Sequence, residues 1–231
     1  KSLLIVPIIM SFSAILIFIA FFMAGFKSDG GPMPLYFIIF FFAFYLWTTF
    51  LASMQAWMVY EVARGKDATF ASGLNRAFKN LLDIVAFAFT ALVLGLLAGA
   101  IRGKGRVGEV AGGFIDRLAG IAGKLVLPAM IITERNFGDS VKQLSKSLKA
   151  LPEIAAYEIG IGPLTFLAFW LGLGLAILFG LVFGIFAGLI IFVLIILALI
   201  VLSILVNQVY YTLVYLALIE KKKLKGLDLK A

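Results

Sequence analysis

The longest uncharged stretch of the chain constrains its fold more than any other feature. Between Glu158 and Glu220 lie 61 residues without a charged side chain. As one helix this stretch would be about 92 Å long at the usual rise per residue, whereas the hydrocarbon core of a bilayer is only about 30 Å thick. We therefore expect two membrane-spanning helices, and a turn between them among Gly180, Gly184 and Gly188.

The rest of the chain carries four more apolar stretches. Apolar residues make up 63% of the sequence and charged residues 14%, against about 45–50% and about 25% in soluble domains. The fourth stretch is the weakest, because it holds charged residues and Pro128, which neighbouring helices can accommodate. The sequence predicts an all-α integral membrane protein, one domain over residues 1–231, with six transmembrane helices. The predicted spans are residues 3–26, 35–60, 81–101, 114–133, 159–182 and 187–219.

The connections between these spans indicate an orientation. Lys27–Pro34 reads as a turn, and Arg102–Gly113 as a flexible, glycine-rich connection. Of the 20 Lys and Arg residues, 14 lie on the side that carries both termini, and cytoplasmic loops are enriched in these residues. We therefore expect a multi-pass protein of the cell membrane with both termini in the cytoplasm. The net charge of +8 then reflects an anionic leaflet and not a nucleic-acid partner.

Two polar stretches resemble each other at an offset of 70 residues, so that Thr69 matches Asp139 and Arg76 matches Lys146. Each is predicted to form a short amphipathic helix at the membrane interface. Thr69 or Asp67 can cap the first helix and Asp139 the second. The repeat predicts three helical hairpins, joined by interfacial helices that act as elbows or that bind anionic lipid or an acidic partner.

The apolar face of the first amphipathic helix is predicted to include Phe70, Leu74 and Phe78, with Arg76 and Lys79 on the opposite face. Basic residues on such faces, and those after the last span, are candidate contacts for lipid headgroups. These candidates are Arg76, Lys79, Lys146, Lys149, Lys221, Lys222 and Lys223.

Charged residues within the fourth span form the strongest candidate site. Asp116, Gly120 and Lys124 are spaced by four residues and so share one side of a helix. An intramembrane charge is expensive unless it is paired or hydrated. One interpretation is a polar cavity for a substrate or ion, lined by Asp116 and Lys124, with Glu158 as a further partner. The other places Asp116 and Arg117 at the interface and lets Lys124 extend outward to it.

Glycines and amides form a second group of candidates. Gly180, Gly184 and Gly188 are spaced for close helix packing, although the same glycines are candidates for the turn between the last two spans. Asn207 and Gln208 are predicted to bond between helices, with a substrate site as the alternative.

Several segments also resemble a known family. The run LLIVPIIMSFSA, the segment LVLPAMIITERNFGDSVKQLSKSLKAL and the Tyr-rich NQVYYTLVYLALIE are similar to an uncharacterised family of prokaryotic six-span membrane proteins, a domain of unknown function. The residues that carry this similarity are Pro7, Pro128, Glu134, Ser140 and Tyr211. The family is loosely similar to the membrane domain of some glycerophosphodiester phosphodiesterases. The resemblance implies six helices and no activity to carry over.

Composition excludes many chemistries. The chain has neither His nor Cys, which removes catalytic triads, thiolate metal sites and disulfides. The carboxylates show no metal-binding or acid–base spacing, so we expect neither an enzyme nor a cofactor or metal. The sequence favours a non-catalytic scaffold, assembly or lipid-interacting subunit, whose partners are membrane lipids and another membrane protein or a second copy. The alternative is a small transporter or channel with a polar cavity at the fourth span.

Overall fold

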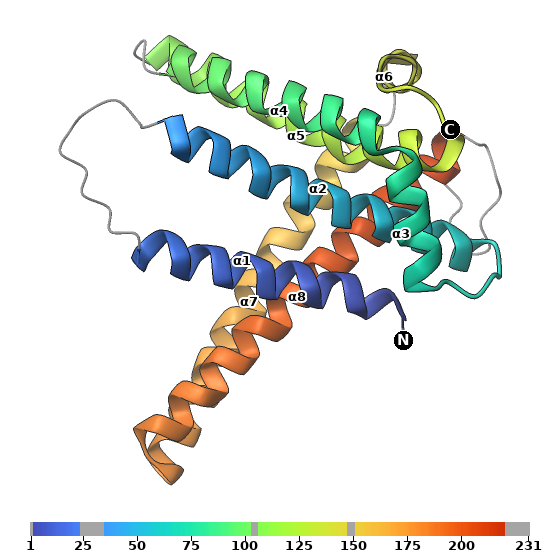
Figure 1. The fold of residues 1–231 in the computed structure, drawn as a ribbon. Coiled ribbons are helices and arrows are strands. Elements are labelled where there is room, and N and C mark those ends of the chain that lie inside the picture. The colour runs from blue at the N-terminus through green and yellow to red at the C-terminus, as the bar shows by residue number, and fades with distance from the viewer. Residues whose placement is uncertain (1, 24–34, 103–105, 147–150, 220–231) are drawn as a thin grey trace.

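The computed structural model describes residues 2–23, 35–102, 106–146 and 151–219. All regular structure in these ranges is helical (Figure 1). A short 3-10 helix at Ser2–Leu4 leads into the first α-helix. The α-helices are α1 (Ile5–Met23), α2 (Leu35–Ala63), α3 (Phe70–Lys79), α4 (Leu81–Arg102), α5 (Arg106–Thr133), α6 (Phe137–Lys146), α7 (Leu151–Phe183) and α8 (Ile185–Ile219).

Three stretches of the described chain are long and apolar enough to cross a membrane. They are Leu81–Arg102, Thr165–Phe183 and Ile185–Ala217. Their hydrophobic residues are largely exposed, which is the arrangement expected of helices that face lipid. The all-helical class is therefore confirmed. The six-span count and the three-hairpin arrangement remain predictions.

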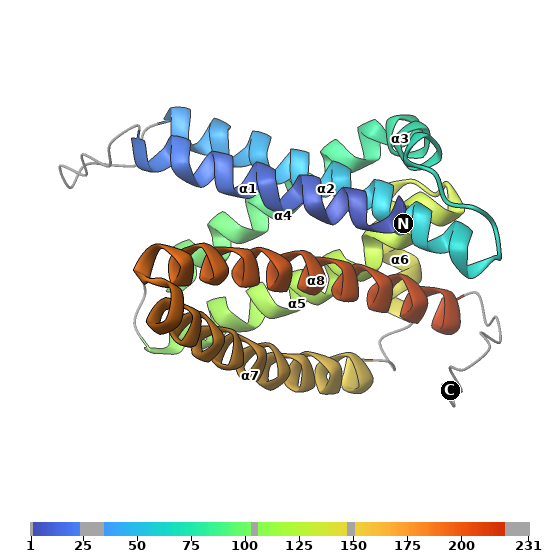
Figure 2. The same ribbon diagram turned by 90° about the horizontal axis from the view of Figure 1, so that it is seen from below.

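Helix α2 lies at the centre of the molecule. It packs against α1, α3, α4, α5 and α8 (Figures 1 and 2). Its Leu51, Met54 and Met58 are at most 2% exposed, and they form a cluster with Ile84 of α4 and Ile131 of α5. This cluster joins the N-terminal half of the chain to α5.

The structure corrects the expected flexible connection between the third and fourth spans. Most of Arg102–Gly113 is helical, because α4 runs to Arg102 and α5 begins at Arg106. Close packing at Gly112 explains why this segment is helical. A Cβ at Gly112 would lie 2.6 Å from the carbonyl oxygen of Ala98. The glycine lets the two backbones approach closely, and this packing outweighs its low helix propensity.

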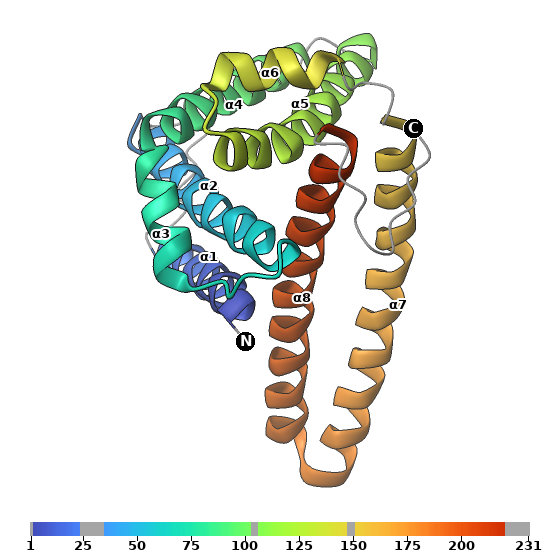
Figure 3. The same ribbon diagram turned by 90° about the vertical axis from the view of Figure 1, so that its right-hand side faces the viewer.

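Helices α7 and α8 lie along each other, and the ends that meet at their turn project away from the other helices (Figure 3). The turn between them is at Gly184, whose φ of +96° favours glycine. Gly180 and Gly188 face each other beside it, with a Cβ on Gly188 only 2.8 Å from the Cα of Gly180. The three glycines thus divide the two predicted roles: Gly184 makes the turn, and Gly180 and Gly188 permit close packing. We call α7 and α8 together the α7–α8 arm.

Candidate functional site

A cavity of about 310 Å³ lies beside Lys124 of α5. Gly120 and Gly123 of the same helix line it, so one turn of α5 presents two positions without a side chain next to the charged one. Helices α1, α2, α4 and α8 supply the other walls. The remaining lining residues are Met10, Tyr45, Thr48, Thr49, Ala52, Phe87, Leu127 and Gln208. We call this space the Lys124 cavity.

The ammonium group of Lys124 is held beside Tyr211 of α8. Its Nζ lies 3.4 Å from the hydroxyl oxygen of Tyr211 and 4.9 Å from the ring centroid. Tyr211 is 2% exposed and is part of a buried cluster with Phe87 and Leu127, which both also line the cavity. The ammonium group therefore lies against a buried aromatic ring, and cation–π attraction stabilises it there.

Three other polar side chains of the Lys124 cavity donate to backbone carbonyls. The hydroxyls of Thr48 and Thr49 donate to the carbonyl oxygen of Tyr45, at 2.9 and 2.7 Å. Nε2 of Gln208 donates to the carbonyl oxygen of Ala52 at 2.9 Å. The predicted interhelical role of Gln208 thus has a defined partner, since this bond joins α8 to α2. Asn207 also lies on α8.

Of the predicted cavity residues, Lys124 lines this space. Gly120, which the sequence placed on the same side of the helix, lines it as well. Asp116 belongs to α5 and Glu158 to α7, but their side chains lie outside the described residues. Sequence reasoning missed Tyr45, Thr48 and Thr49, because hydroxyl groups in an apolar helix carry no signal of which helix they face.

The predicted contact of Arg76 with lipid headgroups is wrong. Arg76 is 8% exposed and points into the protein, where Nε donates to the carbonyl oxygen of Ile131 at 2.7 Å and NH2 to that of Ile132 at 3.2 Å. NH1 forms an ion pair with Glu134, and the guanidinium lies 4.2 Å from the ring centroid of Trp57. The physical reason is that the last carbonyls of α5 lack intrahelical donors, and Arg76 supplies them.

The buried face of α3 agrees with the predicted one only in part. Phe70 and Leu74 pack against the core as predicted. Gly73, Arg76 and Ala77 are also buried, whereas Phe78 is 57% exposed and makes a T-shaped ring contact with Phe50. Desolvation lowers the pKa of Arg76, but the ordinary pKa of a guanidinium is so high that the charge remains at neutral pH.

The caps of α3 and α6 differ in origin. Thr69 caps α3 as predicted, because its side chain accepts from the backbone N–H of Ser72. For α6 the expectation of Asp139 is wrong, since the helix begins at Phe137 and Asp139 lies in its first turn. The carboxylate of Asp83 in α4 instead accepts from the N–H of Phe137 at 3.1 Å. The two helices begin at Phe70 and Phe137, 67 residues apart and not 70.

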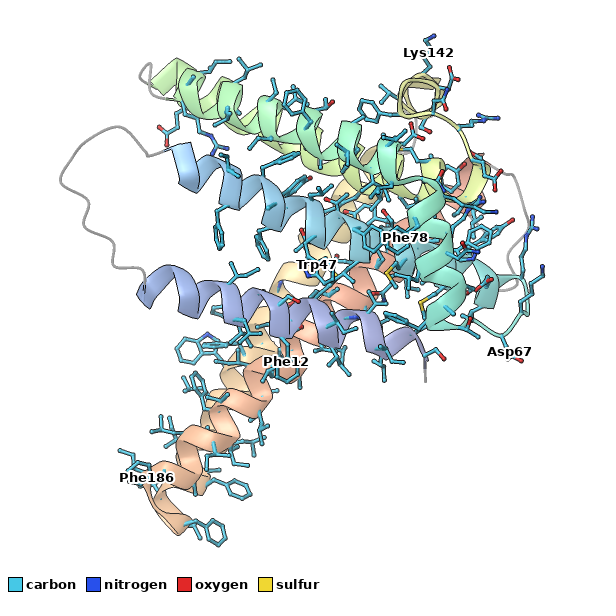
Figure 4. All side chains as sticks on the ribbon, viewed as in Figure 1. Phe12, Trp47, Asp67, Phe78, Lys142 and Phe186 are labelled. Atoms are coloured by element: carbon cyan, nitrogen blue, oxygen red, sulfur yellow. The ribbon has the colours of Figure 1, made fainter. Side chains whose placement is uncertain are left out.

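The remaining predicted headgroup contacts lie near one end of the molecule or outside its described part. Lys79 is exposed at the end of α3, and Lys146 belongs to α6. Lys142 of α6 points away from the other helices, and Asp67 lies at the same end (Figure 4). Lys149, Lys221, Lys222 and Lys223 lie outside the described residues.

Comparisons with known proteins assign no role to these features. Neither a family model, nor a curated protein, nor a solved structure matches the chain. Within the described ranges, no three carboxylates gather where they could hold a metal ion. The resemblance to the six-span family therefore stays a prediction.

Proposed function

We propose that the chain is a non-catalytic integral membrane protein that assembles laterally with another membrane protein. The observation that carries this proposal is the shape of the α7–α8 arm. An open groove of about 490 Å³ runs between its two helices, and small residues line it at Ala176, Gly180 and Gly188. Larger apolar residues, among them Leu181 and Leu189, form its rim. Grooves with small residues at their floor are the surfaces on which membrane helices pack.

The surroundings of the groove support the same role. In the described chain, α7 packs mainly against α8 (Figure 3). Val182 and Phe186 near the tip of the arm are 70% and 79% exposed, and Phe186 points away from the body of the molecule (Figure 4). So large an apolar surface is compatible only with lipid or an apolar partner.

We further infer that six helices, α1, α2, α4, α5, α7 and α8, cross the cell membrane as three hairpins. Helices α3 and α6 lie at the same end of the molecule as the start of α1 and the end of α8 (Figure 1). The exposed Lys79 and Lys142 belong to this end. Basic residues mark the cytoplasmic face, so we assign both termini to the cytoplasm and anionic lipid headgroups to these lysines.

Two tryptophan variants test the assembly role. Leu181→Trp puts a large side chain on the rim of the groove, whereas Val182→Trp adds the same ring at an exposed neighbour outside the groove. After chemical cross-linking in native membranes and extraction in mild detergent, we expect a partner at fixed stoichiometry that Leu181→Trp loses and Val182→Trp keeps. A dimer with this pattern identifies a second copy as the partner. Recovery of lipid alone, equal for all three proteins, would refute the proposal.

A second candidate function is a small transporter or channel, and the Lys124 cavity favours it. The cavity lies among five helices and contains a charged side chain, and charges within membrane helices mark transport paths and binding sites. Flux of small ions and acids into proteoliposomes tests this function. Lys124→Met should change the flux, whereas Lys142→Met, which removes the same charge from α6, should leave it unchanged.

A further inference from the structure

Three polar side chains of the Lys124 cavity present hydrogen-bond acceptors to a ligand. Thr48 and Thr49 direct their hydroxyl hydrogens to one backbone carbonyl of α2, and Gln208 donates an amide hydrogen to another. Their oxygen atoms keep acceptor capacity, because a hydroxyl oxygen and an amide oxygen each have two lone pairs. Tyr45 also lines the cavity, and its hydroxyl can accept as well as donate. A ligand that donates a hydrogen bond complements this wall.

The charge of the cavity wall favours a neutral ligand. Lys124 is exposed, and its ammonium group is already engaged by Tyr211, whose hydroxyl oxygen lies 3.4 Å and whose ring centroid lies 4.9 Å from Nζ. This ammonium group repels a second cation, so a protonated amine is disfavoured. An ionised carboxylate is an acceptor only, and it does not complement a wall of acceptor oxygens. An uncharged group with a donor fits both conditions, and a hydroxyl is the smallest such group.

The rest of the wall suits a hydrocarbon body. Met10, Ala52, Phe87 and Leu127 line the cavity together with the polar groups. The volume of about 310 Å³ lies at the lower limit of ordinary ligand pockets, which begin at about 300 Å³. A single chain or ring fits this volume better than an intact phospholipid. Gly120 on the wall is exposed, so a longer chain can extend past it into the bilayer.

We propose that the Lys124 cavity binds an uncharged alcohol with an apolar body, whose hydroxyl donates to the acceptor oxygens that Thr48, Thr49 and Gln208 present. Such an alcohol reaches the cavity either from the water phase or from the bilayer, where monoacylglycerols carry free hydroxyl groups beside one acyl chain. The proposal goes beyond the assembly role of the α7–α8 groove and does not rest on it. It shares its place with the second candidate function, but the ligand need not cross the membrane.

Valine variants remove the acceptors without changing the shape of the cavity. Thr48→Val and Thr49→Val each replace a hydroxyl by a methyl group, and the carbonyl that accepted both hydroxyl hydrogens keeps its helical N–H partner. Thr90→Val is the matched control. Thr90 of α4 donates to the carbonyl oxygen of Ala86 at 2.8 Å in the same intrahelical way, but it does not line the cavity. Thr48→Ser keeps the acceptor oxygen and should keep binding.

The experiment labels the full chain with a photoactivatable octanol that carries a diazirine on its carbon chain. The protein is held in phosphatidylcholine nanodiscs, because this lipid has no hydroxyl group, and labelled residues are located by mass spectrometry. We expect saturable labelling of residues that line the cavity, such as Met10 and Leu127. The double variant of Thr48→Val and Thr49→Val should weaken binding about tenfold, whereas Thr90→Val should bind like the unmodified protein. Unchanged thermal unfolding of each variant establishes that a lost signal reflects the site and not the fold.

Competitor ligands test the hydroxyl in the unmodified protein. Octanol should displace the probe, whereas octyl methyl ether, which has the same chain and oxygen but no O–H group, should displace it about tenfold more weakly. Competition by benzyl alcohol identifies water-soluble alcohols as ligands, and a preference for monooleoylglycerol identifies bilayer lipids. Equal competition by octanol and its ether would overturn the proposed donor. Absence of saturable labelling, labelling confined to the α7–α8 groove, or binding that the double valine variant leaves intact would refute the site.

Discussion

Replacing Arg76 by methionine tests whether this residue fastens α3 to the end of α5. Methionine keeps the apolar contact with Trp57 and removes all three polar interactions of the guanidinium. The carbonyls of Ile131 and Ile132 then lose their donors, and both residues are buried, at 0% and 7% exposure.

The magnitude follows from these contacts. A buried acceptor left without its partner costs about 1–3 kcal/mol, so two carbonyls give about 2–6 kcal/mol. The ion pair adds at most about 1 kcal/mol, because the Glu134 side chain is 64% exposed. Water that enters the vacated space recovers part of this loss. We therefore expect Arg76→Met to lower the free energy of unfolding by about 2–4 kcal/mol.

The assay is unfolding of the detergent-solubilised protein by sodium dodecyl sulfate, followed by circular dichroism. Lys79→Met is the control, because this lysine is exposed on the same helix, and it should change the free energy by less than about 0.5 kcal/mol. Arg76→Lys should fall between the two, since an ammonium cannot reproduce the fork of the guanidinium. If Arg76→Met and Lys79→Met have equal effects, Arg76 does not cap α5.

Three further predictions concern single contacts. Asp83→Ala removes the cap of α6 and should cost about 1 kcal/mol, seen as faster amide exchange in α6; exchange as slow as in the unmodified protein would contradict the cap. Gly188→Ala places a Cβ 2.8 Å from the Cα of Gly180 and should cost about 1–3 kcal/mol in the same unfolding assay, whereas Gly174→Ala, with nothing within 4 Å, should cost almost nothing. Gln208→Leu removes one interhelical bond and should cost about 0.6 kcal/mol, so that a loss above about 2 kcal/mol would assign Gln208 a larger role.

The positions of the helices could be predicted from the sequence better than the sides of the helices that are buried. Each predicted apolar stretch falls largely within one of the helices α1, α2, α4, α5, α7 and α8, because hydrophobicity along the chain is a local property. Helices α5 and α7 begin earlier than predicted, at Arg106 and Leu151. The side of α3 that is buried is not local. It depends on the unsatisfied carbonyls at the end of α5, which are 55 residues away from Arg76 at Ile131, and the periodicity of α3 contains no information about them.

The candidate site was predictable to a similar extent. Lys124 was predicted as a site residue because a charge within an apolar helix is unusual. Its spacing of four residues from Gly120 placed the two on the same side of the helix. The opposite walls of the cavity, with Thr48 and Gln208, depend on how α2 and α8 pack against α5. Distances between helices cannot be obtained from hydropathy, so these residues had no distinguishing signal.

The length of α8 has a consequence for the bilayer around the protein. Its 35 residues extend about 52 Å, which exceeds the hydrocarbon thickness of about 30 Å, and the helix runs obliquely to α1 and α2 (Figure 1). Tilting is how an overlong helix avoids hydrophobic mismatch. In the proposed membrane placement, a thinner bilayer would increase the tilt of α8 from the membrane normal and a thicker one would decrease it. The crossing angle between α8 and its neighbours would then respond to the surrounding lipids.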